Sequence, residues 1–412
     1  MAKEDKKCVV PRLRFPEFGT AGDWTTEKLG AVATISTEKV GNKVCVPMSI
    51  TSGVGLVSQA DKFGRVIAGD SYKNYLLLNP NDFAYNKSAT KEYPEGYLTL
   101  YSGTELAAVP NSIFTCFRIN GKSPDTRFLN YQFSDNLHGR WLRKFIQIGA
   151  RAHGSLSIND RDLMALPVPI PSGETSVTEQ KKIADCLTSL DELVAAQGRK
   201  VEALMSYKCG LMQQLFPREG ETLSNLRFTE FNNAGDWVPK LLGDVVKSFK
   251  TGKLDANAMV ENGEYRFYTC AKNYYQIDNY AFEGEALLVA GNGAHLGYIH
   301  HYIGKFNAYQ RTYVLQKFEV NVMFLRYLLD LYLPARIQFE KKDGNTPYIV
   351  LSTLTEMPLV IPRDPDEQQR IAMCLSSLDA LITAETQKHE ALKTHKKGMM
   401  QQLFPSSEEI DA

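Results

Sequence analysis

The most constraining feature of this chain is an internal repeat, because two copies of one motif must fold in equivalent surroundings. Residues 13–18 read LRFPEF and residues 226–231 read LRFTEF, and each copy is followed by Gly-Asp-Trp and then Leu-Gly at the same spacing. A second repeated block covers residues 180–217 and 368–405, and both copies end in Gln-Gln-Leu-Phe-Pro. Between these blocks the two halves differ. The sequence therefore predicts two equivalent modules with a constant frame and different interiors.

Composition narrows the class of protein. At 412 residues, several domains are expected. Seven cysteines without a Cys-x-x-Cys pair indicate a reducing compartment, and argue against a disulfide or zinc framework. With 47 basic and 47 acidic residues, bulk positive charge cannot drive nucleic-acid binding, so such contacts must come from local patches or from a partner. No apolar run is long enough to span a membrane, and the start lacks a signal-peptide core. We therefore expect a cytoplasmic protein without a membrane partner.

The second repeated block predicts two long helices, over residues 177–216 and 365–404. Residues 176–179 read Ser-Val-Thr-Glu, which is a capping-box pattern, and residues 364–367, Asp-Pro-Asp-Glu, are its counterpart with proline at the first helical position. Each helix should end at its Phe-Pro pair, because proline cannot continue the hydrogen-bond ladder. The expected bounds are therefore the same in both copies.

A heptad pattern of apolar residues runs along both helices, which is typical of a coiled coil. Because the two copies are equivalent, we expect the helices to pair with each other in an antiparallel, pseudo-twofold arrangement. The candidate residues of this coiled-coil seam are Ile183, Leu187, Leu190, Val194, Leu204, Leu211, Leu215, Ile371, Leu375, Leu378, Ile382, Leu392, Met399 and Leu403.

Polar residues interrupt the two seams at matching places. Gln197 corresponds to Glu385, and Lys208 corresponds to Lys396. Two interpretations stay open at this point. The positions are either drift on a solvated surface or polar contacts that control the register of the coiled coil.

The modules between the repeated blocks cover residues 25–175 and 238–363. Their short β-prone runs are broken by glycine, asparagine and proline, which favours an α+β module with a curved, mostly antiparallel sheet. Helical stretches are expected at 126–146 and 321–339, and proline-rich closing strands at 166–171 and 357–362.

Polar and basic residues gather in the loops of both modules. Asparagine, glutamine and arginine carry the paired donors and acceptors that read base edges, and lysine binds phosphate. The alternative for any single residue is an ordinary turn or a solvated charge, but the clustering in both modules favours DNA contact. The DNA-binding candidates are Asn86, Lys87, Ser88, Lys91, Arg143, Lys144, Arg151, His153, Asn292, His295, Tyr309, Gln310, Arg311, Lys341 and Lys342.

No catalytic motif is complete in this sequence. Residues 121–123 resemble the end of a phosphate-binding loop, but the glycine required five residues earlier is Cys116. Residues 291–297 form a misspaced glycine loop, and residues 79–82 lack the second proline and the aromatic residue of an amino-methyltransferase motif. The seven histidines show no metal-ligand spacing. We therefore expect no catalytic residue, no metal and no cofactor in this chain.

With its paired LRF-x-EF, Gly-Asp-Trp and Leu-Gly openings, proline-rich strand ends and Gln-Gln-Leu-Phe-Pro helices, the chain resembles the DNA-specificity subunit of type I restriction-modification systems. The resemblance implies an α+β fold with two target-recognition domains separated by two long antiparallel coiled-coil helices. The implied divisions are an N-terminal recognition domain (1–176), a central conserved helix (177–217), a C-terminal recognition domain (218–364), a distal conserved helix (365–405) and a flexible tail (406–412).

For function, the resemblance implies a non-catalytic, host-defence subunit that reads a bipartite, asymmetric target in double-stranded DNA. It implies two methyltransferase (modification) subunits that dock on the two long helices, so that the seam residues are also the partner-binding candidates. It further implies restriction endonuclease-translocase subunits that join the complex. S-adenosylmethionine, the donor for adenine-N6 methylation, would then bind the partner methyltransferase. Two rival functions are a self-contained adenine methyltransferase and a symmetric coiled-coil scaffold that binds only proteins.

Overall fold

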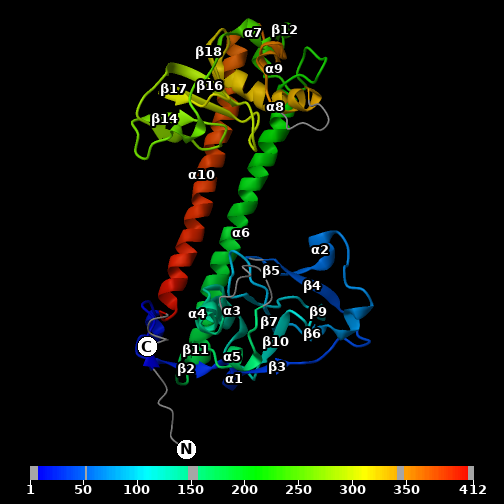
Figure 1. The fold of residues 1–412 in the computed structure, drawn as a ribbon, viewed down its shortest axis with the longest axis vertical. Helices are drawn as coiled ribbons and strands as arrows, with labels where there is room; N and C mark the ends of the chain where they lie inside the picture. Colours follow the sequence, from blue (N-terminus) through cyan, green and yellow to red (C-terminus); the bar gives the residue numbers. More distant parts are fainter. Residues whose placement is uncertain (1–7, 52, 147–155, 341–347, 407–412) are drawn as a thin grey trace, which may run out of the picture. The chain divides into compact units, whose positions relative to one another are not determined.

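The structure is a computed structural model, and it describes residues 8–51, 53–146, 156–340 and 348–406. The chain divides into two compact units, and each unit contains one module with parts of both long helices. The first unit comprises Met1–Ala196 and His389–Ala412, and the second comprises Gln197–Lys388. The long helices are α6 (Ser176–Leu215) and α10 (Pro365–Leu403), each within one residue of the predicted bounds at both ends (Figure 1).

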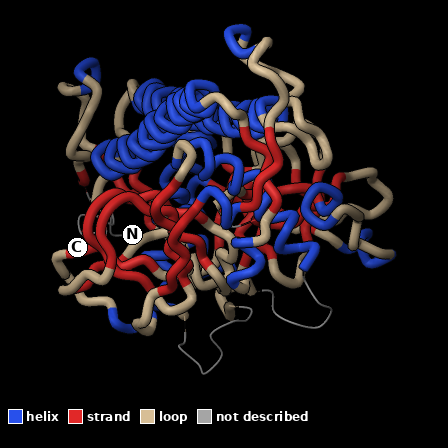
Figure 2. The backbone as a smooth tube through the Cα atoms, turned by 90° about the horizontal axis from the view of Figure 1, so that it is seen from above, coloured by secondary structure: helices blue, strands red, loops and turns tan. Residues whose placement is uncertain are grey.

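The module of the first unit is built from short strands and short helices. Loops, tan in Figure 2, connect most of them. Its strands are β1 (Cys8–Val9), β2 (Trp24–Lys28), β3 (Ala33–Ser36), β4 (Val46–Thr51), β5 (Gly55–Ser58), β6 (Leu76–Leu78), β7 (Phe83–Asn86), β8 (Tyr97–Leu100), β9 (Ala107–Val109), β10 (Phe114–Ile119) and β11 (Pro167–Ile170). Its helices are η1 (Pro16–Phe18), α1 (Leu29–Val32), α2 (Gln59–Phe63), η2 (Asp70–Asn74), α3 (Thr126–Ser134), α4 (Leu137–Leu142), η3 (Arg143–Phe145) and α5 (Asp160–Met164).

The module of the second unit has fewer and longer elements. Its strands are β12 (Val238–Leu241), β13 (Val246–Thr251), β14 (Tyr265–Tyr268), β15 (Tyr275–Ile277), β16 (Phe282–Ala290), β17 (Ile299–Ala308), β18 (Thr312–Phe318) and β19 (Pro358–Ile361). Its helices are η4 (Thr229–Phe231), α7 (Leu242–Val245), η5 (Ala256–Ala258), α8 (Val322–Glu340) and α9 (Leu351–Thr355). These strands and those of the first module confirm the predicted α+β class.

The main sheets of the two modules have the same order. The first contains β3-β10-β7-β8, and the second begins β13-β18-β16-β17 with the same antiparallel pairings. The second sheet continues through β14 and β15, whereas the first module places β5-β4-β9-β6 in a separate sheet. The modules therefore share a sheet topology although their sequences differ.

One helical prediction was wrong in detail. The stretch 126–146 was expected to be a single helix, but α3 ends at Ser134 and α4 begins at Leu137. Asn136 has φ 64°, a left-handed conformation that asparagine tolerates and that interrupts a right-handed helix. The corresponding stretch of the second module is continuous, as α8.

The repeated Arg and Trp of the first motif bind the start of α6. Arg14 Nε and Nη2 donate to the two carboxylate oxygens of Glu179, each at 2.7 Å. Trp24 Nε1 donates to the same carboxylate at 3.2 Å. Glu179 and Trp24 are both fully buried. The predicted capping box was therefore wrong, because the Glu179 side chain serves this ion pair instead.

The second unit repeats this arrangement at the start of α10. Arg227 Nε and Nη2 donate to Glu367, each at 2.7 Å, and Trp237 Nε1 donates at 3.1 Å. Asp364 caps the helix by accepting from the Asp366 amide at 2.9 Å, but Glu367 binds Arg227 and Trp237, so the capping box predicted over residues 364–367 was correct only for Asp364. The spacing of the LRF and Gly-Asp-Trp motifs thus serves one buried ion pair in each unit.

The glutamine after each glutamate holds the helix that follows the sheet. Gln180 Oε1 accepts from the Asp125 amide at 2.7 Å, just before α3. Gln368 Oε1 accepts from the Asn321 amide at 3.0 Å, just before α8. The Glu-Gln pair therefore joins each module to its long helix at two points.

The polar seam residues make contacts between α6 and α10. Gln197 is almost completely buried, and its Nε2 donates to the Glu385 carbonyl at 2.9 Å and to the Glu385 carboxylate at 2.6 Å. Lys208 pairs with Asp379 at 2.5 Å, and the Tyr327 hydroxyl donates to the same carboxylate at 2.6 Å. The set Lys396, Asp191 and Tyr131 repeats this arrangement in the first unit.

These contacts exclude surface drift and favour register control. A later residue of α6 meets an earlier residue of α10, so the helices are antiparallel, as predicted. All fourteen predicted seam residues are buried or half-buried. Those nearest the module ends also pack on the modules, as Leu187 does beside Phe128 and Leu375 beside Phe324.

Candidate nucleic-acid interface

Three of the predicted DNA-binding residues line one cleft in the second module. Asn292 follows β16, and Gln310 and Arg311 precede β18. Because these two strands are antiparallel neighbours, all three residues lie at the same end of the strands, which is called here an edge of the sheet. The cleft has a volume of about 810 Å³. Its lining comprises Thr251, Gly291, Asn292, Gly293, Gln310, Arg311, Tyr313, Tyr348 and Ile349.

Backbone hydrogen bonds hold the loops of this cleft together. The Gly291 amide donates to the Arg311 carbonyl and the Ile349 amide donates to the Gly291 carbonyl, both at 2.9 Å. A Cβ atom at residue 291 would lie 2.4 Å from the Arg311 carbonyl oxygen. Glycine is therefore required at this position for the two loops to approach so closely.

The side chains of the cleft differ in how they are held. Gln310 Nε2 donates to the Asp255 carboxylate at 2.7 Å. Within the described ranges, no hydrogen bond fixes the side chains of Asn292 and Arg311. These two groups can therefore turn toward a ligand without breaking an existing contact. His295 and Tyr309 are half-buried nearby and do not line the cleft.

The first module presents its candidates on the equivalent loop, after β7. Lys87 donates its amide to the Ile113 carbonyl at 2.8 Å, which joins this loop to the start of β10. Asn86 is buried, and its Oδ1 accepts from the Ser88 amide at 2.8 Å. Asn86 therefore orders the loop, and the half-buried Lys87 and Ser88 with the exposed Lys91 are its accessible polar residues.

The other basic candidates of this module follow α4. Arg143 forms an ion pair with Glu95, which is buried, while the Arg143 side chain remains largely exposed. Lys144 Nζ lies 3.2 Å from the centroid of the Trp141 ring, a cation–π contact. The remaining candidates, Arg151, His153, Lys341 and Lys342, lie outside the described residues.

A matching hydrogen bond relates the two loops. The Leu156 amide donates to the Lys87 carbonyl at 2.7 Å, just as the Ile349 amide donates to the Gly291 carbonyl. β7 and β16 occupy the same place in their sheets, so the two loops lie at equivalent edges. Loops chosen for their residue types therefore occupy the same topological position in both modules.

Four residues at these sheet edges were not among the predicted candidates. Thr251 and Tyr348 line the second cleft, while Asp255 and Glu95 hold Gln310 and Arg143. Each partner is far along the chain from the residue that it contacts. No local pattern indicates Thr251 or Tyr348, whereas an acidic residue among polar and basic loop residues is a signal that could have suggested Asp255 and Glu95.

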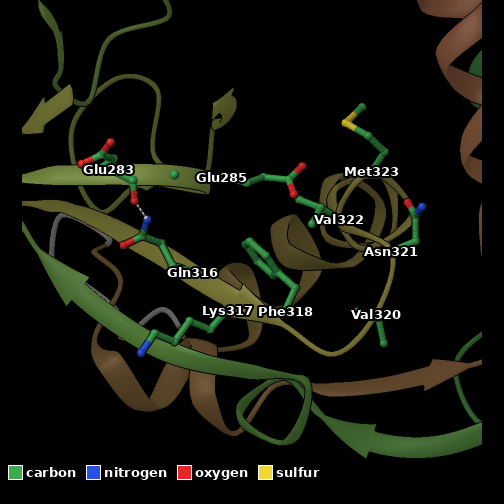
Figure 3. A pocket seen from close by; sticks show the side chains of 10 residues that line it. Glu283, Glu285, Gln316, Lys317, Phe318, Val320, Asn321, Val322 and Met323 are labelled. Atoms are coloured by element: carbon green, nitrogen blue, oxygen red, sulfur yellow. Dashed lines mark hydrogen bonds between the residues drawn. The ribbon is translucent and has the colours of Figure 1, made fainter. Parts of the chain in front are cut away.

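A second hollow of about 640 Å³ lies at the other end of β16 and β18 (Figure 3). Glu283 and Glu285 line it together with Phe318 and Met323, and Gln316 donates to the Glu283 carbonyl at 2.9 Å. None of the predicted DNA-binding residues that the structure describes lines this hollow. Two carboxylates would repel phosphate, so this hollow is the weaker candidate for DNA.

Histidine and metal chemistry give no second site. In the described parts of the chain, no group of three or more His, Cys, Asp or Glu residues could hold a metal ion. His300 Nε2 contacts the Ala271 carbonyl, and burial lowers the pKa of its imidazole. His301 pairs with Glu285. Among the described helices, none is both long and apolar enough to cross a membrane.

The proteins that this chain is similar to, in sequence and in fold, are specificity subunits or domains of type I restriction-modification systems. Residues 234–394 match the type I restriction modification DNA specificity domain. A segment of 157 residues is 39% identical to the Type I restriction enzyme EcoDI specificity subunit of Escherichia coli. That match covers 38% of this chain and spans only 34% of the EcoDI subunit's own length.

The fold is similar over a greater length. The S subunit of the type I restriction-modification system from M. genitalium has a TM-score of 0.62 at 16% identity, covering 97% of this chain and 100% of that chain. A chain from a structure of complex assembly and conformational transition of the type I R-M system has a TM-score of 0.57 at 14% identity, covering 93% and 98%. In the sequence of its second module and in its fold as a whole, the chain therefore resembles the specificity subunits of type I restriction-modification systems.

Proposed function

We propose that this chain is the non-catalytic specificity subunit of a type I restriction-modification complex and reads a bipartite target in double-stranded DNA. The observation that carries the proposal is the shared position of the two candidate loops. Asn292, Gln310 and Arg311 line one cleft, and Lys87 and Ser88 lie at the equivalent edge of the other module. These groups supply the donors and acceptors that base edges and phosphates require.

The target should be asymmetric, because the two edges differ chemically. The first combines Lys87, Ser88, Lys91 and Arg143, whereas the second has amide side chains beside one arginine. Two unlike sets of contacts select two unlike half-sites. The domain bounds that go with this reading are 1–176 and 218–364 for recognition, 177–217 and 365–405 for the conserved helices, and 406–412 for the tail.

The partners follow from the type of complex. Two methyltransferase subunits would dock on the frame formed by α6 and α10, and restriction endonuclease-translocase subunits would join them. S-adenosylmethionine would bind the methyltransferase. The zero net charge of this chain supports such an assembly, since partners would supply much of the attraction to phosphate. We place the complex in the cytoplasm, where all seven cysteines would stay reduced, and none is disulfide-bonded here.

The test is selection from a randomised duplex DNA library by the full chain, with and without its methyltransferase partner. The proposal expects two short conserved half-sites with a non-specific spacer. Binding of the methyltransferase without any DNA preference would favour a protein scaffold. Methyl transfer from S-adenosylmethionine by the single chain would favour a self-contained enzyme.

Exchange of one module tests whether each module reads one half-site independently. Replacing residues 25–175 with the equivalent region of a relative should change one half-site and leave the other intact. Methylome sequencing of cells that carry the hybrid provides the measurement. A change in both half-sites would contradict independent reading by the two modules.

A further inference from the structure

The amide orientation of Gln310 is determined by its neighbour. Gln310 lies in the turn between β17 and β18, and its backbone amide donates to the Leu254 carbonyl at 2.9 Å. Its side-chain Nε2 donates to Asp255 Oδ1 at 2.7 Å. An ionised carboxylate can only accept hydrogen bonds, so the amide nitrogen must face Asp255. Oε1 and one N–H of Gln310 therefore stay available at the cleft.

In the described parts of the chain, the Asp255 side chain makes no hydrogen bond or ion pair besides this contact. It directly precedes η5, but its side chain does not cap that helix. It is exposed, and it lies at the edge that we assign to DNA, where a carboxylate would repel phosphate. The presence of Asp255 at this edge is explained if its carboxylate orients the Gln310 side chain for contact with a base.

We propose that the second module reads an adenine through Gln310, and that Asp255 is the positioning residue that makes this reading selective. The inference rests on the proposed function. In the major groove, adenine presents the N7 acceptor beside the N6 amino donor, which matches one N–H and one carbonyl oxygen of glutamine. Guanine presents two acceptors, N7 and O6. Asp255 prevents the amide from turning its nitrogen fully toward the DNA, so the Gln310 carbonyl oxygen would face the guanine O6 acceptor. Two acceptors repel each other, and Gln310 therefore rejects guanine.

The experiment compares variants of the full chain, assembled with its methyltransferase partner, in selection from a randomised duplex library at fixed salt. The wild type should require adenine at one position of the second half-site, preferred by roughly five- to 150-fold over the other bases. Gln310→Ala should reduce that preference to within about twofold. Asp255→Asn should reduce the preference for adenine over guanine to about threefold or less, because asparagine, unlike aspartate, can donate to the Gln310 carbonyl oxygen and let the Gln310 amide nitrogen face the DNA.

A double variant and a control sharpen the test. In the double variant Asp255→Asn with Gln310→Glu, the side chain at residue 310 presents only acceptors. The base preferred at the same DNA position should therefore change toward cytosine, whose N4 is a donor. Asp278→Asn removes the same charge from the exposed turn between β15 and β16 and should change no base preference. An unchanged first half-site in every variant shows that the complex is folded.

The outcomes separate the two proposals. If Gln310→Ala keeps every base preference, Gln310 does not read a base and the inference fails, while the proposed function stands. If Gln310→Ala removes the preference but Asp255→Asn keeps the rejection of guanine, the positioning role of Asp255 is wrong. If the wild-type complex selects no sequence at all, the proposed function itself fails.

Discussion

The buried ion pair between Arg14 and Glu179 should dominate the attachment of the first module to α6. Glu179 is fully buried and Arg14 nearly so, and Trp24 adds a third group to the same carboxylate. Breaking a buried pair by removing one partner costs about 3–5 kcal/mol, because the other charge is left uncompensated. Glu179→Ala should therefore lower the local free energy of opening by that amount.

Hydrogen exchange of the β2 amides provides the measurement, since β2 begins at Trp24. At about 1.4 kcal/mol per power of ten, protection of β2 should fall by roughly two to four powers of ten. Glu179→Gln with Arg14→Met removes both charges and keeps an acceptor for the indole N–H of Trp24. This double variant should recover most of the loss, because an apolar side chain replaces the unpaired guanidinium.

The second unit contains the matched control. Glu367→Ala removes the equivalent carboxylate, so it should expose β12 to exchange and leave β2 protected. A change in β2 protection of less than tenfold in Glu179→Ala would contradict the expected cost of the unpaired charge. An equal effect of either substitution on both units would show that the two ion pairs do not act locally.

Three further outcomes are expected. Glu95→Gln should weaken binding to the first half-site alone by several-fold, measured by fluorescence anisotropy, because it frees the Arg143 guanidinium. Burial lowers the pKa of His138 to about 4, below the ~6.5 of an unfolded chain, so the unfolded state binds more protons between these values. Unfolding free energy should thus fall by up to about 3 kcal/mol as pH drops from about 6.5 to 4, and His138→Gln should flatten that fall in urea titrations. Leu187→Asp with Leu375→Asp should abolish co-purification with the methyltransferase, since each charge would be buried at a cost of several kcal/mol.

Periodicity predicted the frame well because its signals are local. The heptads and the Phe-Pro ends determined both long helices, and the proline-rich runs at 166–171 and 357–362 located β11 and β19. The break at Asn136 was missed, since an asparagine in the left-handed conformation cannot be told from a helical asparagine by sequence pattern. Glu179 was assigned to a capping box because its true partners, Arg14 and Trp24, are more than 150 residues away.

The candidate site shows the same limit. Residue type and loop position identified Asn292, Gln310 and Arg311, and the structure brings them to one cleft. Sequence alone could not indicate that Asp255 or Tyr348 lies beside them, because those contacts depend on how four separate loops pair. Nor could it show that Asn86 is buried, since an asparagine after a strand resembles any exposed turn residue.

The position of the cleft explains how one fold can keep its frame and change its interior. β18 begins beside Arg311, at the cleft, and ends close to Asn321, whose amide Gln368 holds. β10 likewise begins beside Ile113, which binds the Lys87 loop, and its far end leads to Asp125, which Gln180 holds. In each module the candidate DNA-binding loop and the contact with the long helix therefore lie at opposite ends of one strand. Under the proposed function, substitutions in that loop would change base preference without disturbing the contact with the long helix, so the surface offered to partners would stay the same.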